Sequence, residues 1–321
     1  MKRKQYRIDN GDGWRLDATR YWDPDRLDTS RRPVMAVPGF CMNCFVLNYH
    51  PSERPLVEFL VDAGLEVWTT HLRGQGDSER GRGRNRFGFA ELAGVDMPAV
   101  IDFVINQGES EPEQVDLIGC SLGATVSYAY LAMNPADHRV GALVNIGGPL
   151  RWNRVHLLLR IAVQCPPLLG VAPIRGTRQL AKMAMPLIRR FPWLVSPYLN
   201  ADIVDLTKGE TLVQTVDDPN PELTRQMAQW IRDGDLVVDQ LNISHALYAV
   251  DVPIQCVLAM QDGVVTPEAA LSILDHIGSH EVDVVEVGSY HTPHAHADLF
   301  VSEGVGRKVF QPVCDWLEKV A

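Results

Sequence analysis

The stretch VDLIGCSLGATVSYAYL (Val115–Leu131) joins an apolar run of strand length to an Ala-rich segment that is compatible with a helix. Between them lies the glycine-rich turn GCSLG. A Gly-x-Ser-x-Gly pattern at a sharp strand-to-helix turn projects the serine oxygen outward, and Gly119 and Gly123 would relieve crowding on either side. The pattern alone is weak evidence, and a serine that only fills a tight turn is the simpler reading. Its position between a strand and a helix makes Ser121 a candidate nucleophile.

Apolar runs of strand length alternate with longer segments that carry apolar residues at helical spacing. A turn at Asn10–Gly13 between two alternating runs predicts an N-terminal hairpin. Near-continuous apolar strands separated by helices predict a mostly parallel, doubly wound α/β sheet, with functional loops at the carboxyl ends of the strands. The predicted core strands begin at Val34, Leu65, Val115, Val140, Ile254 and Val282.

One interval, residues 151–250, breaks this alternation. It shows helical patterning and many prolines but no convincing core strand, and it is too long for a structureless loop. We therefore expect residues 1–150 and 251–321 to form the α/β core. Residues 151–250 are expected to form an inserted helical cap over the strand ends.

Composition narrows the class of protein. A formal net charge of −10 over 321 residues argues against nucleic acid as the main partner. Six cysteines in a chain of this length do not indicate a disulfide framework. The basic start has no apolar core of a secretory signal, and the apolar segment 155–174 is interrupted by Arg160, Gln164 and the Pro166–Pro167 pair. We expect a cytoplasmic protein without a transmembrane segment.

A nucleophilic serine needs a base, an orienting carboxylate and donors for an oxyanion. Asp262, in LAMQDGVVTP, follows a predicted strand and is placed to enter the cleft, although an ordinary Asp-Gly turn would use the same residues. In VPGFCMN, Gly39 would let the backbone N–H of Phe40 point inward. The N–H of Leu122, at the start of the helix after Ser121, is the expected second donor.

Two further stretches carry a resemblance to a known family. GFAELAGVDMPAVIDFV is similar to a helix with an Asp-x-Pro-Ala signature, here Asp96–Ala99, and HLRGQGDS (His71–Ser78) resembles an Arg-Gly-x-Gly-x-Ser segment. With the serine turn, these make the chain resemble α/β-hydrolase fold enzymes, nearest to the acid-lipase-like branch of esterases and lipases. The resemblance covers about residues 33–150 and 252–321. It departs from the family at Pro38, where His is usual, and at His71, where Asp is frequent.

The base is expected in VEVGSYHTPHAHADLF, which offers three histidines. His296 fits the lipase-like pattern best, since His-x-Asp is followed by apolar residues, whereas His291 fits another common version and His294 is the least favoured. A rival interpretation is a metal site in which Asp298 joins His294 and His296. Zinc needs three or four such ligands, and Leu299 stands where that motif has a further histidine.

The resemblance implies a carboxylic-ester hydrolase that uses no cofactor and no metal. Ser121 would attack the ester, His296 would take its proton, and Asp262 would orient the imidazole. The N–H groups of Phe40 and Leu122 would receive the oxyanion. Acyl transfer or thioester cleavage on the same triad is an alternative, and so is a non-catalytic ligand-binding protein of this fold.

The cap and two motifs complete the expectations. Apolar cap residues suggest an acyl pocket for apolar or lipid-like esters, and transient contact of the cap with a membrane surface. The Cys41-x-x-Cys44 pair is read as two cysteines lining a pocket rather than a redox or zinc pair. The Arg-rich segment 73–86 is read as a solvated loop rather than an anion site. The apolar cap residues are Leu157, Leu158, Leu159, Ile161, Leu168 and Leu169.

Overall fold

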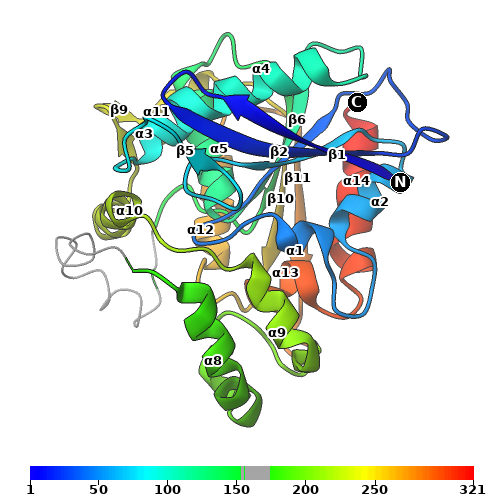
Figure 1. Ribbon diagram of the computed structural model, residues 1–321, viewed down its shortest axis with the longest axis vertical. Helices are drawn as coiled ribbons and strands as arrows, with labels where there is room; N and C mark the ends of the chain where they lie inside the picture. The colour runs from blue at the N-terminus through cyan, green and yellow to red at the C-terminus, as the bar shows by residue number, and fades with distance from the viewer. Residues whose placement is uncertain (153–154, 156–173) are drawn as a thin grey trace.

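The computed structural model describes residues 1–152, 155 and 174–321. Among these residues a nine-stranded sheet has the order β1-β2-β4-β3-β6-β7-β10-β11, with the short β5 paired to β2 (Figure 1). The pairs from β4 through β11 are parallel, whereas β2 is antiparallel to β1, β4 and β5. The strands are β1 (Lys2–Asp9), β2 (Trp14–Trp22), β3 (Val34–Val37), β4 (Val67–His71), β5 (Glu79–Arg80), β6 (Val115–Cys120), β7 (Val140–Ile146), β10 (Ile254–Ala259) and β11 (Val282–Val287).

This architecture confirms the mostly parallel α/β sheet, and all six predicted core strands are present. The predicted hairpin is also confirmed, since all of β1 pairs with residues 15–22 of β2. Its turn is closed by Asn10, whose side-chain oxygen accepts the N–H groups of Asp12 and Trp14. Gly11 and Gly13 have φ of 73° and 75°, a region that favours glycine.

The sheet is covered on both faces, as its strands require. In β3, Met35 and Val37 pack into one hydrophobic cluster, while Val34 and Ala36 pack into another on the opposite face. This alternation follows from the two-residue period of a strand. Helices α4 (Met97–Gln107), α5 (Leu122–Met133), α11 (Ile243–Ala246) and α12 (Pro267–Leu271) cover the first face; α1 (Phe45–Asn48), α2 (Leu56–Asp62), α13 (Asp298–Val301) and α14 (Gln311–Lys319) cover the second.

Two helices begin with a π-helical segment that accommodates a proline. Leu92–Asp96 precedes α4, whose second residue is Pro98, and Gly306–Phe310 precedes α14, whose second residue is Pro312. Proline has no N–H for the carbonyl four residues earlier, and wider π spacing absorbs the missing bond. Pro312 therefore lies in the first turn of α14 without breaking the helix.

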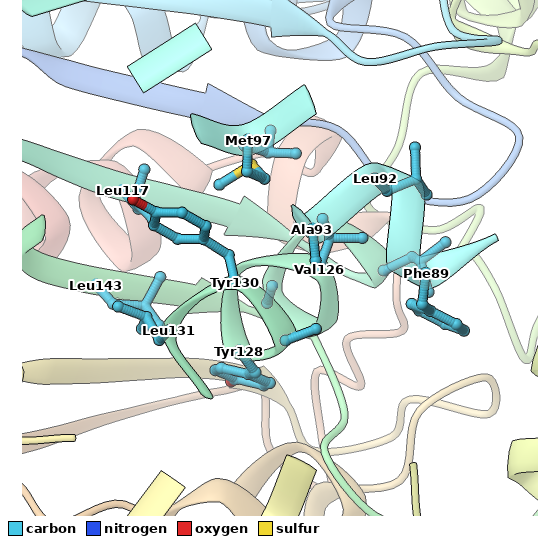
Figure 2. Close-up of a cluster of buried hydrophobic side chains, with 14 of the residues drawn as sticks. Phe89, Leu92, Ala93, Met97, Leu117, Val126, Tyr128, Tyr130, Leu131 and Leu143 are labelled. Carbon is cyan, nitrogen blue, oxygen red and sulfur yellow. The ribbon is translucent and has the colours of Figure 1, made fainter. Parts of the chain in front are cut away.

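Helix α5 is the packing centre of the first face. Figure 2 shows side chains of α5 meeting those of α3 (Phe89–Glu91) and the following π segment beside β6 and β7. Every residue of α5 from Leu122 to Ala132 is buried. The helix that follows the serine turn is therefore fixed on all sides.

The stretch between β7 and β10 contributes no strand to the main sheet among its described residues. It holds α8 (Thr177–Arg190), α9 (Gly209–Leu212), α10 (Pro221–Asp233) and the separate ladder β8 (Val237–Val238)–β9 (Leu241–Asn242). Helix α10 packs on the core through a ring contact between Phe89 and Trp230. The division into core and cap stays a proposal. The apolar cap residues singled out above, Leu157, Leu158, Leu159, Ile161, Leu168 and Leu169, lie outside the described residues.

Candidate active site

Ser121 occupies a strained turn at the carboxyl end of β6. Its φ of 50° and ψ of −119° are unusual for a residue other than glycine. A Cβ at Gly119 would lie 2.3 Å from Ala124 Cα, and one at Gly123 would lie 2.2 Å from the Val37 carbonyl oxygen. The predicted crowding is confirmed, because neither position has room for a side chain.

The structure brings Ser121, His296 and Asp262 together. His296 Nε2 lies 3.0 Å from Ser121 Oγ, and His296 Nδ1 lies 2.6 Å from Asp262 Oδ2. A carboxylate accepts only, so Nδ1 carries the ring proton and Nε2 is left to accept the serine hydroxyl proton. His296 and Asp262 are 6% and 7% exposed, so this relay is largely shielded from water.

Asp262 is held by its other oxygen. Oδ1 accepts the N–H groups of Val264 and Val265, each at 2.8 Å. The residue therefore forms the Asp-Gly turn that was the alternative reading, and it also faces the histidine. The turn fixes the carboxylate that orients the ring.

The other two histidines have different surroundings. His291 is exposed and its ring contacts Tyr290. His294 Nδ1 lies 3.0 Å from the Thr292 carbonyl oxygen, and its Nε2 lies 3.2 Å from Lys308 Nζ. Burial and the charge of Lys308 lower the pKa of His294. Within the described parts of the chain, no three His, Cys, Asp or Glu side chains are grouped as ligands for a metal ion.

Asp298, the third member of the rival metal motif, joins the histidine loop to the segment Pro197–Asn200. Its Oδ2 accepts the N–H of Ala295 at 2.7 Å, and both of its oxygens lie 3.1 Å from the N–H of Asn200. Burial raises the pKa of Asp298 to about 6. We call the contact of Pro197–Asn200 with the loops that carry Asp262 and His296 the seam. Two backbone hydrogen bonds complete it, from Ala297 N–H to the Tyr198 carbonyl and from Gly263 N–H to the Pro197 carbonyl.

Among the described residues, neither of the two expected oxyanion donors, the N–H groups of Phe40 and Leu122, has an acceptor. Gly39 packs against the serine turn, since a Cβ there would lie 3.1 Å from Ser121 Cβ and 2.7 Å from Met42 Sδ. Glycine at 39 therefore allows the close approach, and the departure at Pro38 leaves it intact.

The two signature stretches meet in a buried ion pair. Arg73 Nη2 lies 2.8 Å from Asp96 Oδ1, Nε is 3.0 Å from both carboxylate oxygens, and the Arg73 N–H donates to Oδ2 at 2.9 Å. Asn10 Nδ2 donates to the same carboxylate at 2.7 Å. The expectation of a solvated loop is wrong for Arg73. Its side chain is 1% exposed because it pairs with the buried carboxylate of Asp96. Arg80, Arg82, Arg84 and Arg86 are exposed as expected.

His71 has a structural role that accounts for the departure there. Its Nδ1 lies 2.9 Å from Asp17 Oδ2, and its Nε2 accepts the N–H of Cys44 at 3.0 Å. Burial raises the pKa of the Cys44 thiol well above its usual value, and burial followed by Asp217 raises that of Cys41 to about 12. Thiols with raised pKa values are poor redox or metal-binding groups. Cys41 lines a cavity beside Phe40, as expected, whereas Cys44 is buried and is not among the residues that line this cavity.

The chain is similar to known proteins in both sequence and structure. A family model described as alpha/beta hydrolase fold matches residues 32–164. An esterase from Rhodococcus sp. ECU1013 superimposes with a TM-score of 0.66 at 15% identity, over 99% of both chains. A thermophilic esterase from Thermogutta terrifontis gives a TM-score of 0.63 at 17% identity, also over 99% of both. The chain has the α/β-hydrolase fold.

Sequence relatives of this chain are also found among the curated proteins. It is 30% identical over 143 residues to Lipase member N of Homo sapiens, across 41% of this chain and 35% of that protein. Lysosomal acid lipase/cholesteryl ester hydrolase of Rattus norvegicus is 25% identical over 143 residues, 41% of this chain and 36% of that one. The chain is thus a distant homologue of acid lipases, and it aligns with about a third of their length.

Two cavities have linings that include Leu122, which follows Ser121, or Ala297, which follows His296. One is lined by Phe40 and Leu122 on the oxyanion side. The other lies on the histidine side, between α8 and the core, and its lining includes Ala297, which follows His296. Apart from Tyr198 and Thr215, the residues that line this second cavity are apolar or glycine; they include Val46, Met185, Leu199, Leu212 and Val213.

Sequence reasoning missed three contributors to this site. Gln75, in the segment that carries Arg73, contacts the oxyanion loop. Asn200 and Tyr198 reach the histidine loop from the stretch expected to be the cap. Asn200 contacts Asp298 and Tyr198 contacts Ala297, each about a hundred residues further along the chain. No local sequence pattern therefore indicates these contacts.

Proposed function

We propose that this α/β-hydrolase is a carboxylic-ester hydrolase with Ser121, His296 and Asp262 as its triad. The observation that carries the proposal is the pair of hydrogen bonds at 3.0 and 2.6 Å that links the three side chains. Such a relay is the arrangement that activates a serine for attack on a carbonyl.

The steps follow from the positions of the groups. Ser121 Oγ forms a bond to the ester carbonyl carbon while His296 Nε2 takes the hydroxyl proton. The carbonyl oxygen becomes an oxyanion, which the N–H groups of Phe40 and Leu122 stabilise. His296 returns the proton to the leaving alcohol as the C–O bond breaks. It then takes a proton from the water that attacks the acyl carbon, and gives this proton to Ser121 Oγ as the bond from the acyl carbon to Oγ breaks and the acid leaves. Asp262 stabilises the imidazolium in both halves.

The test is the variant Ser121→Ala. Turnover of an aryl ester should fall at least ~10³-fold with the melting temperature unchanged. A fluorophosphonate, whose phosphorus bonds to Ser121 Oγ as fluoride leaves, should label the wild type and not the variant. An active, folded alanine variant contradicts the proposal, and failure of the wild type to be labelled or to turn over would favour a ligand-binding protein. Acyl transfer to added alcohols in preference to water, or faster cleavage of acyl-CoA, would indicate the transferase or thioesterase alternative.

The substrate class that we propose is esters of apolar or lipid-like acyl groups. Its support is the apolar cavity whose lining includes Ala297, the residue after His296, since apolar ligand atoms are stabilised in a pocket with an apolar lining. A series of aryl esters of increasing acyl length should show kcat/KM rising to medium chains. A maximum at the acetyl ester would contradict this assignment.

Transient contact of the cap with a membrane surface is a further part of the proposal. No described helix is long and apolar enough to cross a membrane. Residues 174–200 contain five basic and no acidic residues in a chain whose net charge is −10. On α8, Leu180, Met183 and Leu187 are 58%, 77% and 54% exposed. A basic helix with exposed apolar side chains fits the surface of an anionic bilayer.

A further inference from the structure

Gln75 uses both ends of its amide beside the candidate oxyanion donors. Its Oε1 accepts the N–H of Leu72 at 3.1 Å, and its Nε2 donates to the Gly39 carbonyl oxygen at 3.1 Å, with a longer contact of 3.5 Å to the Pro38 carbonyl oxygen. Only this orientation of the amide satisfies both partners, because one is a donor and the other an acceptor. Gln75 also lines the cavity that Phe40 and Leu122 line.

The Gly39 carbonyl and the Phe40 N–H belong to one peptide group. In a trans peptide these two groups point in opposite directions, so a partner that holds the carbonyl also sets the direction of the N–H. Here the carbonyl is bonded to Gln75, and the N–H has no acceptor among the described residues. Glycine leaves the backbone before this peptide unusually free to rotate. A rotated peptide would present its carbonyl oxygen where an oxyanion forms.

Gln75 is itself fixed by the buried ion pair two residues earlier. The Arg73 N–H and guanidinium are bound by Asp96, and both side chains are at most 1% exposed. The turn is tightened by a backbone bond from Gln75 N–H to the Leu72 carbonyl. The two signature stretches therefore supply a rigid base from which Gln75 reaches Gly39.

We propose that Gln75 is a positioning residue of the oxyanion site, acting through the Gly39–Phe40 peptide. The inference rests on the proposed function, because it assigns a role within that same site. Gln75 does not touch the substrate in this role. It keeps the Phe40 N–H turned toward the developing negative charge.

Two variants separate the contacts of Gln75. Gln75→Glu keeps an oxygen for the Leu72 N–H and replaces the donor to Gly39 with an acceptor, which repels that carbonyl. Gln75→Met removes both bonds at similar volume. The matched control is Gln226→Met, because Gln226 also bridges two segments, accepting the Phe89 N–H at 3.0 Å and donating to Glu222 at 3.1 Å, but it does not line this cavity.

For Gln75→Glu we expect kcat to fall about 10²-fold, near the effect of losing one oxyanion donor, with KM changed less than about twofold. The inhibition constant of a trifluoromethyl ketone, whose hemiketal oxyanion occupies the same site, should rise by the same factor as kcat falls. Gln226→Met should leave both values nearly unchanged. A folded Gln75→Glu enzyme with wild-type kcat, or a loss confined to KM, overturns the inference.

The outcomes also separate this inference from the proposed function. If the wild type does not hydrolyse esters, the proposed function fails; if it does and the Gln75 variants keep full kcat, only the role of Gln75 fails. Should neither variant fold, a crystal structure of the phosphonylated wild type decides. The phosphonyl oxygen is expected at hydrogen-bond distance, ~3 Å, from Phe40 N, with Gln75 still on the Gly39 carbonyl. A phosphonyl oxygen directed elsewhere overturns the inference.

Discussion

Helices α5 and α8 are similar in length, 12 and 14 residues, and they lie at opposite extremes of burial. All residues of α5 from Leu122 to Ala132 are buried, whereas only Met185 is buried in α8. The first helix carries the candidate nucleophile at its N-terminus, and the second covers a cavity on the histidine side. The parts proposed to do chemistry are thus packed on every side, while the part proposed to meet a lipid surface has an open face.

The polar contacts of the two regions differ in the same way. Near α5 the charges are paired inside the protein, as in Arg73 and Asp96. Near α8 they are paired at the surface, where Asp217 accepts from Arg178 and also from Asn43 and the Gly76 N–H. Breaking a buried pair leaves an uncompensated charge and costs several kcal/mol, but exposed pairs contribute little. The contacts near α5 should therefore contribute more to the stability of the fold than the contacts near α8.

The largest effect is expected where the core ion pair is broken. Asp96→Asn keeps the shape of the side chain but leaves the buried guanidinium of Arg73 without its main counter-charge. We expect the free energy of unfolding to fall by ~3–5 kcal/mol, measured by urea denaturation. Asp12→Asn is the matched control, since Asp12 bonds the same guanidinium at 2.7 Å but is 47% exposed, and it should cost at most ~1 kcal/mol. Equal costs for the two variants would mean that burial of the pair does not matter.

An intermediate effect is expected at the seam where Asp298 meets Asn200. Burial raises the pKa of Asp298 from 3.8 to about 6, so the folded state binds its proton more tightly than the unfolded state. The stabilising contribution of this proton is fully present below about pH 4 and is lost as pH rises through about 6. The full change is about 3 kcal/mol, from the size of the pKa shift.

Comparing wild type with Asp298→Asn isolates this group. The wild type should gain stability relative to the variant as pH falls from 7 to 4, measured by urea unfolding at each pH. Ala295 and Asn200 lose part of their acceptor in the variant at every pH, so only the slope with pH is diagnostic. A stability difference that stays constant over this range would show that Asp298 titrates normally.

Some of this structure could be predicted from the sequence, and the reason is local. The serine turn and the six core strands can be predicted because short apolar runs and a Gly-x-Ser-x-Gly turn depend only on residues that are close together in the sequence. The burial of Arg73 was not, because it depends on Asp96, 23 residues along the chain. The same holds for Gln75, whose contact with Gly39 spans 36 residues. Residues that hold the site come from contacts that only the folded chain makes.

The smallest effect is expected on the open face of α8. Lys182→Gln removes one charge from the basic surface, and the side chain is exposed. Partition onto vesicles of anionic lipid should weaken about fivefold, since one basic residue near such a surface contributes about 1 kcal/mol. Binding to zwitterionic vesicles should be unchanged by the substitution, and Lys319→Gln, on α14 beside Glu281, serves as the control. Two outcomes would show that α8 is not the contact surface and that its exposed leucines have another partner. One is that Lys319→Gln weakens binding as much as Lys182→Gln does; the other is that the wild type binds anionic and zwitterionic vesicles equally.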